Sequence, residues 1–374
     1  MIRRALLVTM TSALVACATQ SPPPPPVAAT APAAAPVSVP LAAPLLAPIP
    51  QPPERPVAPS SVTDPMLPQA QRIDAFVDYT ARTYGVPAQD IRAGLAQAQF
   101  LQRTVDIISR PAEAVRPWSA YRPIFINDAR IAGGVAFYAD NRADLDRIAA
   151  NTGVPAEIIV AIIGVETNYG KNTGNYRVLD ALYSLAFGYP KRAPFFAGEL
   201  AQLFALGQDE HIDVSTLKGS YAGAMGLGQF MPSSYRLWGK DGDGDGKRDL
   251  ISDKDDVFAS IANYFVVHGW QRGGPVVARA TREAGAGDFV PDSIDPVYPL
   301  AALAQRGYHP QSGEPVPADA SQGATLITLD GDAGKEYWLG YRNFYVITRY
   351  NHSPMYAMAV QQLAQAIRAG SGGP

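Results

Sequence analysis

The central apolar stretch of the chain reads Ile158-Ile159-Val160-Ala161-Ile162-Ile163-Gly164-Val165-Glu166-Thr167-Asn168-Tyr169-Gly170. Its first eight residues would make a helix apolar on every side, and such a helix is buried in a protein core. The stretch therefore predicts a central buried helix on which other elements pack. Glu166 falls in its last turn, so we expect its carboxyl at the edge of that core.

The carboxyl of Glu166 is predicted to have a raised pKa. Apolar neighbours desolvate its charged form, the negative end of the helix dipole repels that charge, and the nearest cation in the sequence is Lys171. A carboxylic acid that stays protonated near neutral pH is what a glycosidase needs to protonate a leaving oxygen. The alternative is a structural glutamate that bonds the turn after the helix.

Helical patterns extend to both sides of this stretch. Ile73, Phe76 and Val77 lie on one face of a helix that starts near Gln69, and Gly85 is predicted to end it. Further helices are predicted over about Ala129 to Ala150, Pro155 to Val165, Arg177 to Phe187, Phe195 to Leu206, Val257 to His268 and Met355 to Ala369.

After Gly273 the pattern changes to short β-branched and apolar runs separated by Gly, Pro and Asp, which are typical of strands. The runs are Val276-Val277, Thr325 to Leu329 and Phe344 to Thr348. They predict a small β-rich subdomain within a helical chain. The expected fold class is therefore mainly α, with a minor β part (α+β).

The N-terminal part of the chain predicts an export signal and a linker. Residues 1–16 carry two arginines and then an apolar run. Cys17 is the only cysteine, so it can form no internal disulfide. Leu14-Val15-Ala16-Cys17 resembles a bacterial lipobox, which implies lipidation of Cys17 and, because Ala18 follows, sorting to the outer membrane; cleavage elsewhere is the alternative. Residues 18–68, rich in Pro and Ala, cannot build a core.

Composition and spacing exclude several classes of function. The 374 residues carry a net charge of -3 with no block of Lys and Arg, which argues against a nucleic-acid partner. No histidine pair has metal-ligand spacing, and no strand-turn-helix signal surrounds a serine that could form a catalytic triad. The histidines are His211, His268, His309 and His352. No organic cofactor and no particular protein partner is predicted.

A glycine-rich stretch, residues 219–235, is the second candidate for a functional site. Its glycines and alanines let the backbone approach a ligand closely. Ser220 and Gln229 offer hydrogen bonds, while Tyr221 and Phe230 offer apolar faces, a mixture that suits a sugar. A tightly packed structural turn is the alternative interpretation.

An acidic loop follows, with Asp241, Asp243, Asp245 and Asp249 at positions 1, 3, 5 and 9 and glycine at position 6. This is the first half of an EF-hand calcium loop. Position 12 is Ser252, where such loops usually carry a bidentate glutamate. The loop therefore predicts either a structural calcium site or an acidic turn without an ion.

Several motifs, in this order, resemble the membrane-bound lytic murein transglycosylase B family. They are Glu166 to Gly170, Ala222 to Tyr235, Ala262 to Phe265 with His268-Gly269-Trp270, and Phe344 to Ser353, within a match over roughly Gln69 to Ala369. The resemblance implies a lysozyme-like core over residues 151–272 with a calcium loop at 241–256. It also implies a flanking helical domain at 69–150, a small β-rich subdomain at 273–343, and a return to the core at 344–374.

The resemblance also implies roles for individual residues. Glu166 matches the catalytic acid and base. The implied glycan-cleft residues are Ser220, Gln229, Tyr264, Tyr350, Asn351, Tyr356 and Tyr121. In this family a later aspartate closes the calcium site of Asp241, Asp243, Asp245 and the Lys247 carbonyl; Asp256 aligns best, with Asp253 and Asp255 as competitors.

The leading hypothesis is a lipid-anchored enzyme on the periplasmic face of the outer membrane. It would cleave the β-1,4 bond between N-acetylmuramic acid and N-acetylglucosamine in peptidoglycan and leave 1,6-anhydro ends. A lysozyme-type hydrolase would need a second carboxylate, for which the sequence offers Asp180 and Glu199. A wall-binding scaffold would grip glycan without cutting it, and would have no use for a glutamate of raised pKa.

Overall fold

The computed structural model describes residues 57–110, 116–319 and 321–372. The predicted signal segment, Cys17 and residues 18–56 of the predicted linker lie outside these ranges. Within the described ranges, no single helix is long and apolar enough to cross a membrane. One bent pair, Arg142–Thr152 with Ala156–Thr167, meets that test by length and composition.

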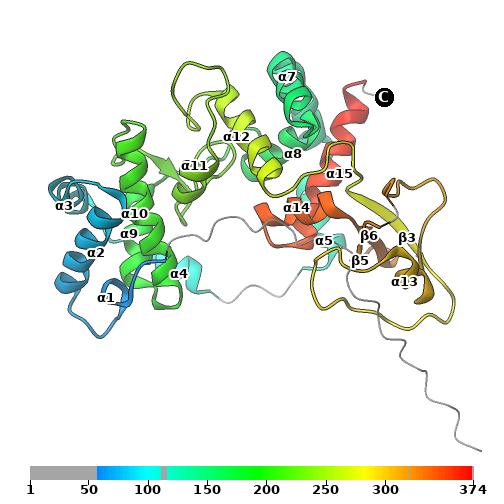
Figure 1. Ribbon diagram of the computed structural model, residues 1–374, viewed down its shortest axis with the longest axis horizontal. Helices are drawn as coiled ribbons and strands as arrows, with labels where there is room; N and C mark the ends of the chain where they lie inside the picture. Colours follow the sequence, from blue (N-terminus) through cyan, green and yellow to red (C-terminus); the bar gives the residue numbers. More distant parts are fainter. Residues whose placement is uncertain (1–56, 111–115, 320, 373–374) are drawn as a thin grey trace, which may run out of the picture. The chain divides into compact units, whose positions relative to one another are not determined.

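The described chain is mainly helical, with two small antiparallel sheets (Figure 1), as predicted. The helices are α1 (Ser60–Thr63), α2 (Gln69–Tyr84), α3 (Ala88–Gln97), α4 (Gln102–Ser109), α5 (Trp118–Phe125), α6 (Asp128–Asp140), α7 (Arg142–Thr152), α8 (Ala156–Thr167), α9 (Val178–Gly188), α10 (Ala193–Asp209), α11 (Pro232–Trp238), α12 (Lys254–Val267), α13 (Leu300–Gln305), α14 (Arg342–Tyr350) and α15 (Pro354–Gly370), with a 3-10 turn at Pro190–Arg192. The strands are β1 (Tyr176–Arg177), β2 (Lys218–Gly219), β3 (Val277–Arg282), β4 (Tyr308–Pro310), β5 (Thr325–Gly331) and β6 (Gly334–Gly340).

Helix α8 is the central buried helix that the apolar stretch predicts. The side chains of residues 159–163 have no exposed surface, and the helix packs against α15, α6, α7 and α12. It ends at Asn168, whose φ of 52° is left-handed, and two backbone N–H groups there bond the last carbonyls of the helix. Glu166 is therefore fixed at the end of a helix that the core holds on several sides.

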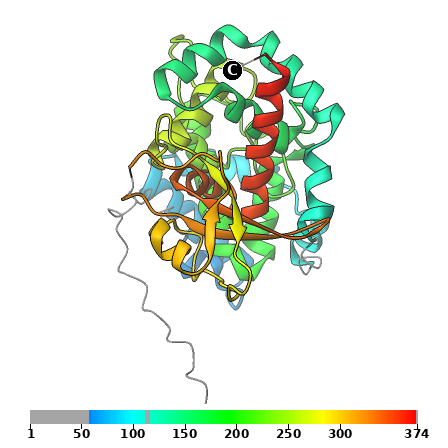
Figure 2. The same cartoon turned by 90° about the vertical axis from the view of Figure 1, so that its right-hand side faces the viewer.

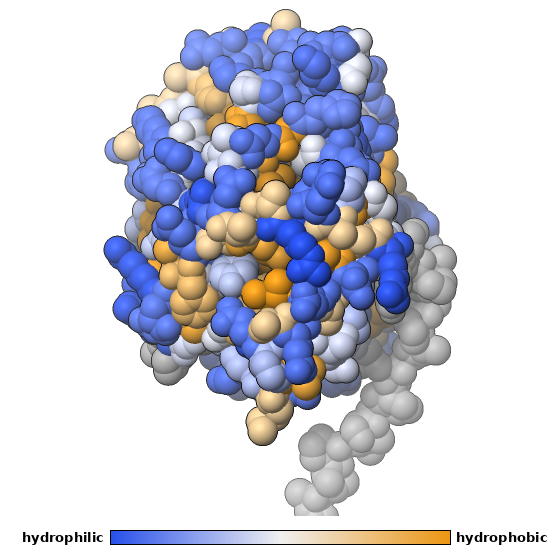
Figure 3. All heavy atoms as spheres, turned by 90° about the vertical axis from the view of Figure 1, so that its left-hand side faces the viewer, coloured by the Kyte–Doolittle hydropathy of each residue, from blue (hydrophilic) through white to orange (hydrophobic). Residues whose placement is uncertain are grey.

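A second group of helices forms around α9 and α10. Helix α10 contacts α9, α2, α1 and α11, and α4 contacts α9. As predicted, α2 ends at Gly85, which takes a left-handed φ of 71°. On the face that carries α2 and α3, hydrophilic side chains surround a hollow in which hydrophobic residues are visible (Figure 3).

The single helix predicted over about Ala129 to Ala150 is wrong, because the structure divides it into α6 and α7. The break lies at Asn141, which leaves the helical conformation. Its side-chain amide donates to the Phe137 carbonyl at 2.7 Å, in place of the backbone N–H that would continue the helix. The chain then turns, and α7 packs against α12 and α8.

The larger sheet has the order β4-β3-β6-β5, and every neighbouring pair is antiparallel. Figure 2 shows its strands beside α15, which is drawn in red. On one face of the sheet, Leu326 and Leu339 pack in a small apolar cluster with α13. Ile327 and Leu329 belong to the main core instead. The predicted strand residues in 276–277 and 325–329 lie in or beside this sheet.

The strand predicted at Phe344 to Thr348 is wrong, because these residues form most of α14. All of them are buried, and α14 packs against α15 and β6. Asn343 fixes its first turn, since its side-chain amide donates to the Gln271 and Gly274 carbonyls at 2.8 Å each. Tertiary packing thus overrides the local strand preference of the β-branched and aromatic residues.

Candidate active site

The carboxyl of Glu166 lies at the end of α8, half-buried. The Tyr356 hydroxyl, at the start of α15, donates to its Oε1 at 2.6 Å. Burial raises the pKa of the Glu166 carboxyl to about 7, and the bond from Tyr356 lowers it in part. As the sequence predicts, this carboxyl can be either protonated or ionised near neutral pH.

Three of the implied cleft tyrosines surround Glu166. Burial raises the pKa of Tyr121, Tyr350 and Tyr356, and the negative charge of Glu166 raises each of them further. The Tyr350 hydroxyl donates to the Gly228 carbonyl at 2.5 Å. These side chains come from α5, α14 and α15, so elements distant in the sequence converge on one carboxyl.

Tyr264 lies behind this group, with only 5% of its surface exposed. Its hydroxyl donates to the Arg349 carbonyl at 2.6 Å, and its ring stacks on His268 at 4.0 Å. On another side it meets the ring of Tyr350 edge-on, with 4.9 Å between the centroids. The structure thus places Tyr264 as a support for Tyr350.

The glycine-rich stretch is tied to the end of α8. The Thr167 hydroxyl, next to Glu166, donates to the Leu227 carbonyl at 3.1 Å. Gln229 has a left-handed φ of 52°, and its side-chain amide donates to the carbonyls of Thr173 at 3.1 Å and Gly226 at 2.9 Å. Together with the hydrogen bond from the Tyr350 hydroxyl to the Gly228 carbonyl, these contacts hold the glycine-rich stretch beside the Glu166 carboxyl.

Ser220 and Asn351 lie at two turns. The Ser220 hydroxyl oxygen accepts from the backbone N–H groups of Ala222 at 3.3 Å and Ala224 at 3.1 Å. Asn351 is exposed at the end of α14, and its side-chain oxygen accepts from the Ser353 N–H at 3.3 Å. Ser220 and Asn351 can therefore bind a ligand only with the hydrogen-bonding groups that these turns do not use.

The two carboxylates considered as partners for Glu166 have structural contacts. Asp180, 6% exposed, accepts from Arg177 at 2.6 Å and from the Gln99 N–H at 2.8 Å. Glu199, 2% exposed, accepts from the Ser233 N–H at 2.9 Å and its hydroxyl at 2.6 Å. The bonds of Asp180 fix the start of α9, and those of Glu199 fix the start of α11. Both carboxylates are thus occupied by structural hydrogen bonds.

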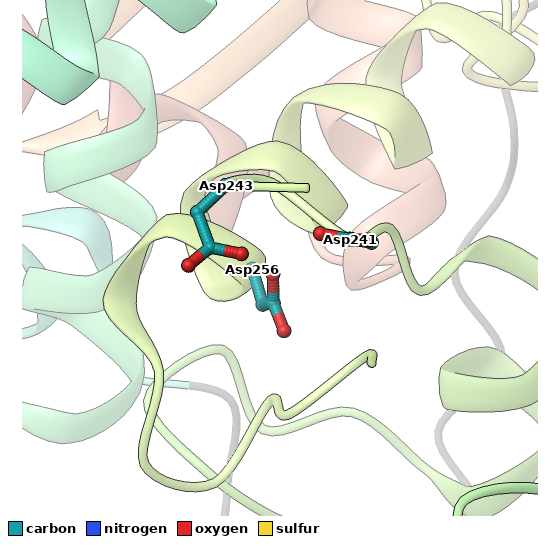
Figure 4. Close-up of side chains that lie close together, drawn as sticks. All are labelled: Asp241, Asp243 and Asp256. Carbon is teal, nitrogen blue, oxygen red and sulfur yellow. The ribbon is translucent and has the colours of Figure 1, made fainter. Parts of the chain in front are cut away.

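Three carboxylates of the acidic loop converge. Oxygen atoms of Asp241, Asp243 and Asp256 lie within 4.8 Å of one another (Figure 4). Asp245 is not in this group, and its Oδ1 accepts from the Lys247 N–H at 2.8 Å. The three converging groups offer hard oxygen donors, which fit a calcium ion.

The competitors for closing this site have other partners. Asp253 caps α12 by accepting from the N–H groups of Asp255 and Asp256. Asp255 pairs with Arg147 at 2.7 Å. Only Asp256 of the three joins the converging group, and it is 1% exposed.

Two residues of this region did not emerge from the sequence. Thr167 binds the glycine-rich stretch, and a buried hydroxyl beside the candidate carboxyl was the available signal. Arg130 donates a hydrogen bond to the Gly164 carbonyl near the end of α8. A cation at this position interacts favourably with the negative end of the helix dipole. No local pattern in the sequence connects Arg130 to that helix.

A model of the transglycosylase SLT domain matches residues 68–365 of the chain. The membrane-bound lytic murein transglycosylase B of Escherichia coli K12 is 42% identical over 309 residues, which cover 80% of this chain and 82% of the relative.

Solved structures are similar over the same region. The Escherichia coli lytic transglycosylase SLT35 in complex with calcium is 41% identical with a TM-score of 0.72, covering 80% of this chain and 93% of that one. SltB3 from Pseudomonas aeruginosa in complex with NAG-NAM-pentapeptide is 32% identical with a TM-score of 0.71, covering 81% of this chain and 80% of that one.

Proposed function

This chain belongs to the lytic transglycosylases with an SLT domain, enzymes that act on peptidoglycan, and we propose that Glu166 is its only catalytic acid and base. The proposed reaction breaks the β-1,4 bond between N-acetylmuramic acid and N-acetylglucosamine and leaves 1,6-anhydromuramic ends. The observation that carries this proposal is one half-buried carboxyl with a pKa of about 7 beside the Tyr356 hydroxyl. Such a group can serve as an acid in one step and as a base in the next.

In the first step, protonated Glu166 gives its proton to the glycosidic oxygen. The bond between that oxygen and the muramic anomeric carbon breaks, and N-acetylglucosamine leaves with a new hydroxyl. Positive charge develops at the anomeric carbon, where the substrate's own 2-acetamido group can stabilise it. The protein then needs no second carboxylate, which agrees with the structural bonds of Asp180 and Glu199.

In the second step, ionised Glu166 takes the proton of the substrate's C6 hydroxyl. The C6 oxygen attacks the anomeric carbon and closes the 1,6-anhydro ring, so the glutamate regains its proton and no water is consumed. Ring closure is intramolecular, and its entropic cost falls when the site already holds the sugar in place. The Tyr356 hydroxyl stabilises the carboxylate between the two steps, because its bond favours the ionised form.

The remaining cleft residues are proposed to hold the sugar. Gln229, Ser220 and Asn351 supply polar contacts, while Tyr121 and Tyr350 supply ring surface beside the carboxyl. Tyr264 acts on the sugar through the position of Tyr350, which its ring contacts.

The test is the variant Glu166→Gln assayed on purified peptidoglycan sacculi. Glutamine keeps the side-chain shape and can still accept from Tyr356, but it carries no titrating proton. Turnover should fall by roughly 10²- to 10⁴-fold, the range for general acid-base catalysis, while binding to sacculi is retained. The matched control Glu283→Gln changes an exposed glutamate of 61% side-chain exposure and should retain wild-type turnover. Substantial activity in Glu166→Gln would contradict the proposal, because another group would then have to be the catalytic acid and base, and inactivity of wild type with retained binding would indicate a scaffold role.

We further propose that Asp241, Asp243 and Asp256 hold a structural calcium ion, with Asp245 and the Lys247 carbonyl completing the site. The convergence of three carboxylates supports this, and the related SLT35 has been solved in complex with calcium. An ion there would join the acidic loop to the start of α12 and neutralise the clustered charge. Its role would be stability, since the loop contributes nothing to the contacts of Glu166 described above.

We also propose a localisation for this chain and a division into domains. The Escherichia coli relative is named as membrane-bound, and we propose that lipidated Cys17 anchors this chain to the periplasmic face of the outer membrane, with the linker that begins at residue 18 as the tether. The predicted end of the linker at residue 68 is wrong, because Ala58 and Val62 are buried in the main core and α1 packs against α2 and α10. The proposed parts after the tether are the helical domain 69–150, the core 151–272, the β-rich subdomain 273–343 and the return 344–374. The separate apolar cluster under the larger sheet supports the β-rich subdomain.

A further inference from the structure

A cleft lies where the start of α8 and the second half of α15 meet the first residues of β3, and it holds about 320 Å³. A second cavity of about 440 Å³ adjoins it, since Trp338 and Gln365 line both. In Figure 2, α15 runs beside the strands of the larger sheet, and Trp338 lies on one of these, β6. We call the two cavities together the α15 cleft. Its lining includes Trp270, Trp338, Gln361 and Gln365.

The α15 cleft is separate from the candidate active site. Helices α8 and α15 pack side by side in opposite directions, so that Tyr356 at the start of α15 bonds Glu166 at the end of α8. At the other end of the pair, Arg368 forms an ion pair with Glu157, and both line the cleft. Glu166 follows Glu157 by nine positions, which is about 14 Å along a helix that rises 1.5 Å per residue. The cleft therefore lies at the opposite end of the helix pair from the carboxyl.

Two half-buried tryptophans give the cleft apolar ring surface. The Trp270 indole N–H donates to the Gly153 carbonyl at 3.0 Å, and the Trp338 N–H donates to Glu336 at 3.2 Å. These bonds satisfy the polar edge of each ring and fix its orientation. What the rings offer to a ligand is their apolar surface, on which the C–H faces of a sugar can pack.

Unpaired polar groups stand beside these rings. The side-chain amides of Gln361 and Gln365 have no hydrogen-bond partner within the described chain, although Gln361 is half-buried. One oxygen of Glu314 accepts from the Arg279 N–H at 3.0 Å, and its other oxygen is left for a ligand. An amide both donates and accepts, whereas a carboxylate only accepts. The ligand that satisfies all of them carries donors and acceptors together, as the hydroxyl and acetamido groups of an amino sugar do.

The charges around the cleft nearly cancel. Its charged side chains are three arginines and four carboxylates, namely Arg122, Arg279, Arg368, Glu157, Glu314, Asp332 and Glu336. A polyanion would need an excess of positive charge, and a cation would need an excess of negative charge. The balance favours an uncharged polar ligand.

We propose that the α15 cleft is a second, non-catalytic binding site for the glycan strands of peptidoglycan. The inference goes beyond the proposed function and uses only the family's action on peptidoglycan. A sacculus presents many glycan segments at once, so a second site on the same chain can raise its affinity by about 10²- to 10⁴-fold. The chain's own residues 18–56 fit the cleft less well, since this segment is rich in proline, which has no N–H to donate to Glu314.

The test is calorimetry of the full chain carrying Glu166→Gln, with a soluble tetramer of N-acetylglucosamine as the ligand. In this variant turnover should be too slow to consume the tetramer. We expect two sites per chain, one at the active site and one in the α15 cleft. Adding Trp338→Ala should remove one of them and lower the affinity for sacculi in co-sedimentation by roughly tenfold or more. The matched control Gln97→Ala changes an exposed glutamine on α3 and should retain both sites.

A second variant keeps the test decisive if Trp338→Ala does not fold. Gln361→Ala combined with Gln365→Ala removes two amides that bond nothing else in the described ranges, so the fold should tolerate it. This variant should also retain a single site, with the affinity of the active site unchanged. One site before these substitutions, or two sites after them, would overturn the proposal. A changed oligomeric state would overturn it as well, because it would assign the cleft to a second copy. A wild type that releases no fragments from sacculi would instead refute the proposed function, and the number of sites would be unaffected.

Discussion

Replacing Glu166 by glutamine should stabilise the fold increasingly as the pH rises. Burial raises the pKa of the Glu166 carboxyl from its ordinary value of 4.5 to about 7 in the folded protein, and unfolding returns it to water. Between these values the folded chain retains a proton that the unfolded chain releases, so wild type loses stability as the pH increases. The contribution is fully present below pH 4.5 and disappears as the pH rises through about 7.

The magnitude follows from the same pKa values. The interval between 4.5 and about 7 corresponds to roughly 3.4 kcal/mol at 1.36 kcal/mol per pKa unit. About 2.5 kcal/mol of this falls between pH 5 and pH 8. Glutamine cannot ionise, so the free energy of unfolding of Glu166→Gln should gain that amount relative to wild type over this range.

Urea unfolding at several pH values between about 5 and 8 measures this difference. The control is Asp106→Asn, which changes an exposed carboxyl on α4 and should differ from wild type by a constant amount. A difference between Glu166→Gln and wild type that stays constant over the range would refute the argument that the core holds this carboxyl protonated.

Three further predictions follow from the site and the termini. Tyr356→Phe removes a hydrogen bond that lowers the pKa of Glu166. The alkaline limb of the kcat/KM profile should therefore move up by about 1 to 2 pH units, which is the worth of one hydrogen bond to a charged group. The control Tyr308→Phe loses a hydrogen bond to a remote carbonyl and should leave the limb in place. Calcium at about 100 times its Kd should raise the free energy of unfolding by about 2.7 kcal/mol, and Asp256→Asn should abolish most of this response in calorimetry with and without chelator. Cys17→Ser should move the protein from the membrane fraction to the soluble periplasmic fraction, and unchanged fractionation would contradict lipid anchoring.

Much of the helical core could be predicted because its apolar sequence is stable only in a buried environment. A helix apolar on every side, such as residues 158–165, is stable only when it is buried. The strand predicted at Phe344 to Thr348 failed because local preference is weak against packing, and α14 is fixed by the contacts of Asn343 with residues 271–274. The prediction of one continuous helix through Asn141 failed for a similar reason. A single asparagine is compatible with a continuing helix, and the break depends on the packing of α7 against α12 and α8.

The candidate site divides in the same way. The raised pKa of Glu166 could be predicted from its place at the end of an apolar helix, because burial is the largest cause of the rise. The partner of that carboxyl could not, since Tyr356 lies 190 residues away and only the family resemblance pointed to it. Asp256 is a comparable case: spacing left three aspartates open, and the structure separates them by assigning caps and ion pairs to Asp253 and Asp255.

The most direct test of the single-carboxylate reaction is the chemical form of the muramic ends that the wild-type enzyme releases from purified sacculi in water labelled with heavy oxygen. The proposed reaction closes the ring with the substrate's own C6 oxygen, so mass spectrometry should find anhydro ends that are one water lighter than reducing ends and carry no label. Reducing muramic ends that contain the heavy oxygen would contradict it, because they would show that water, activated by another group, attacks the anomeric carbon.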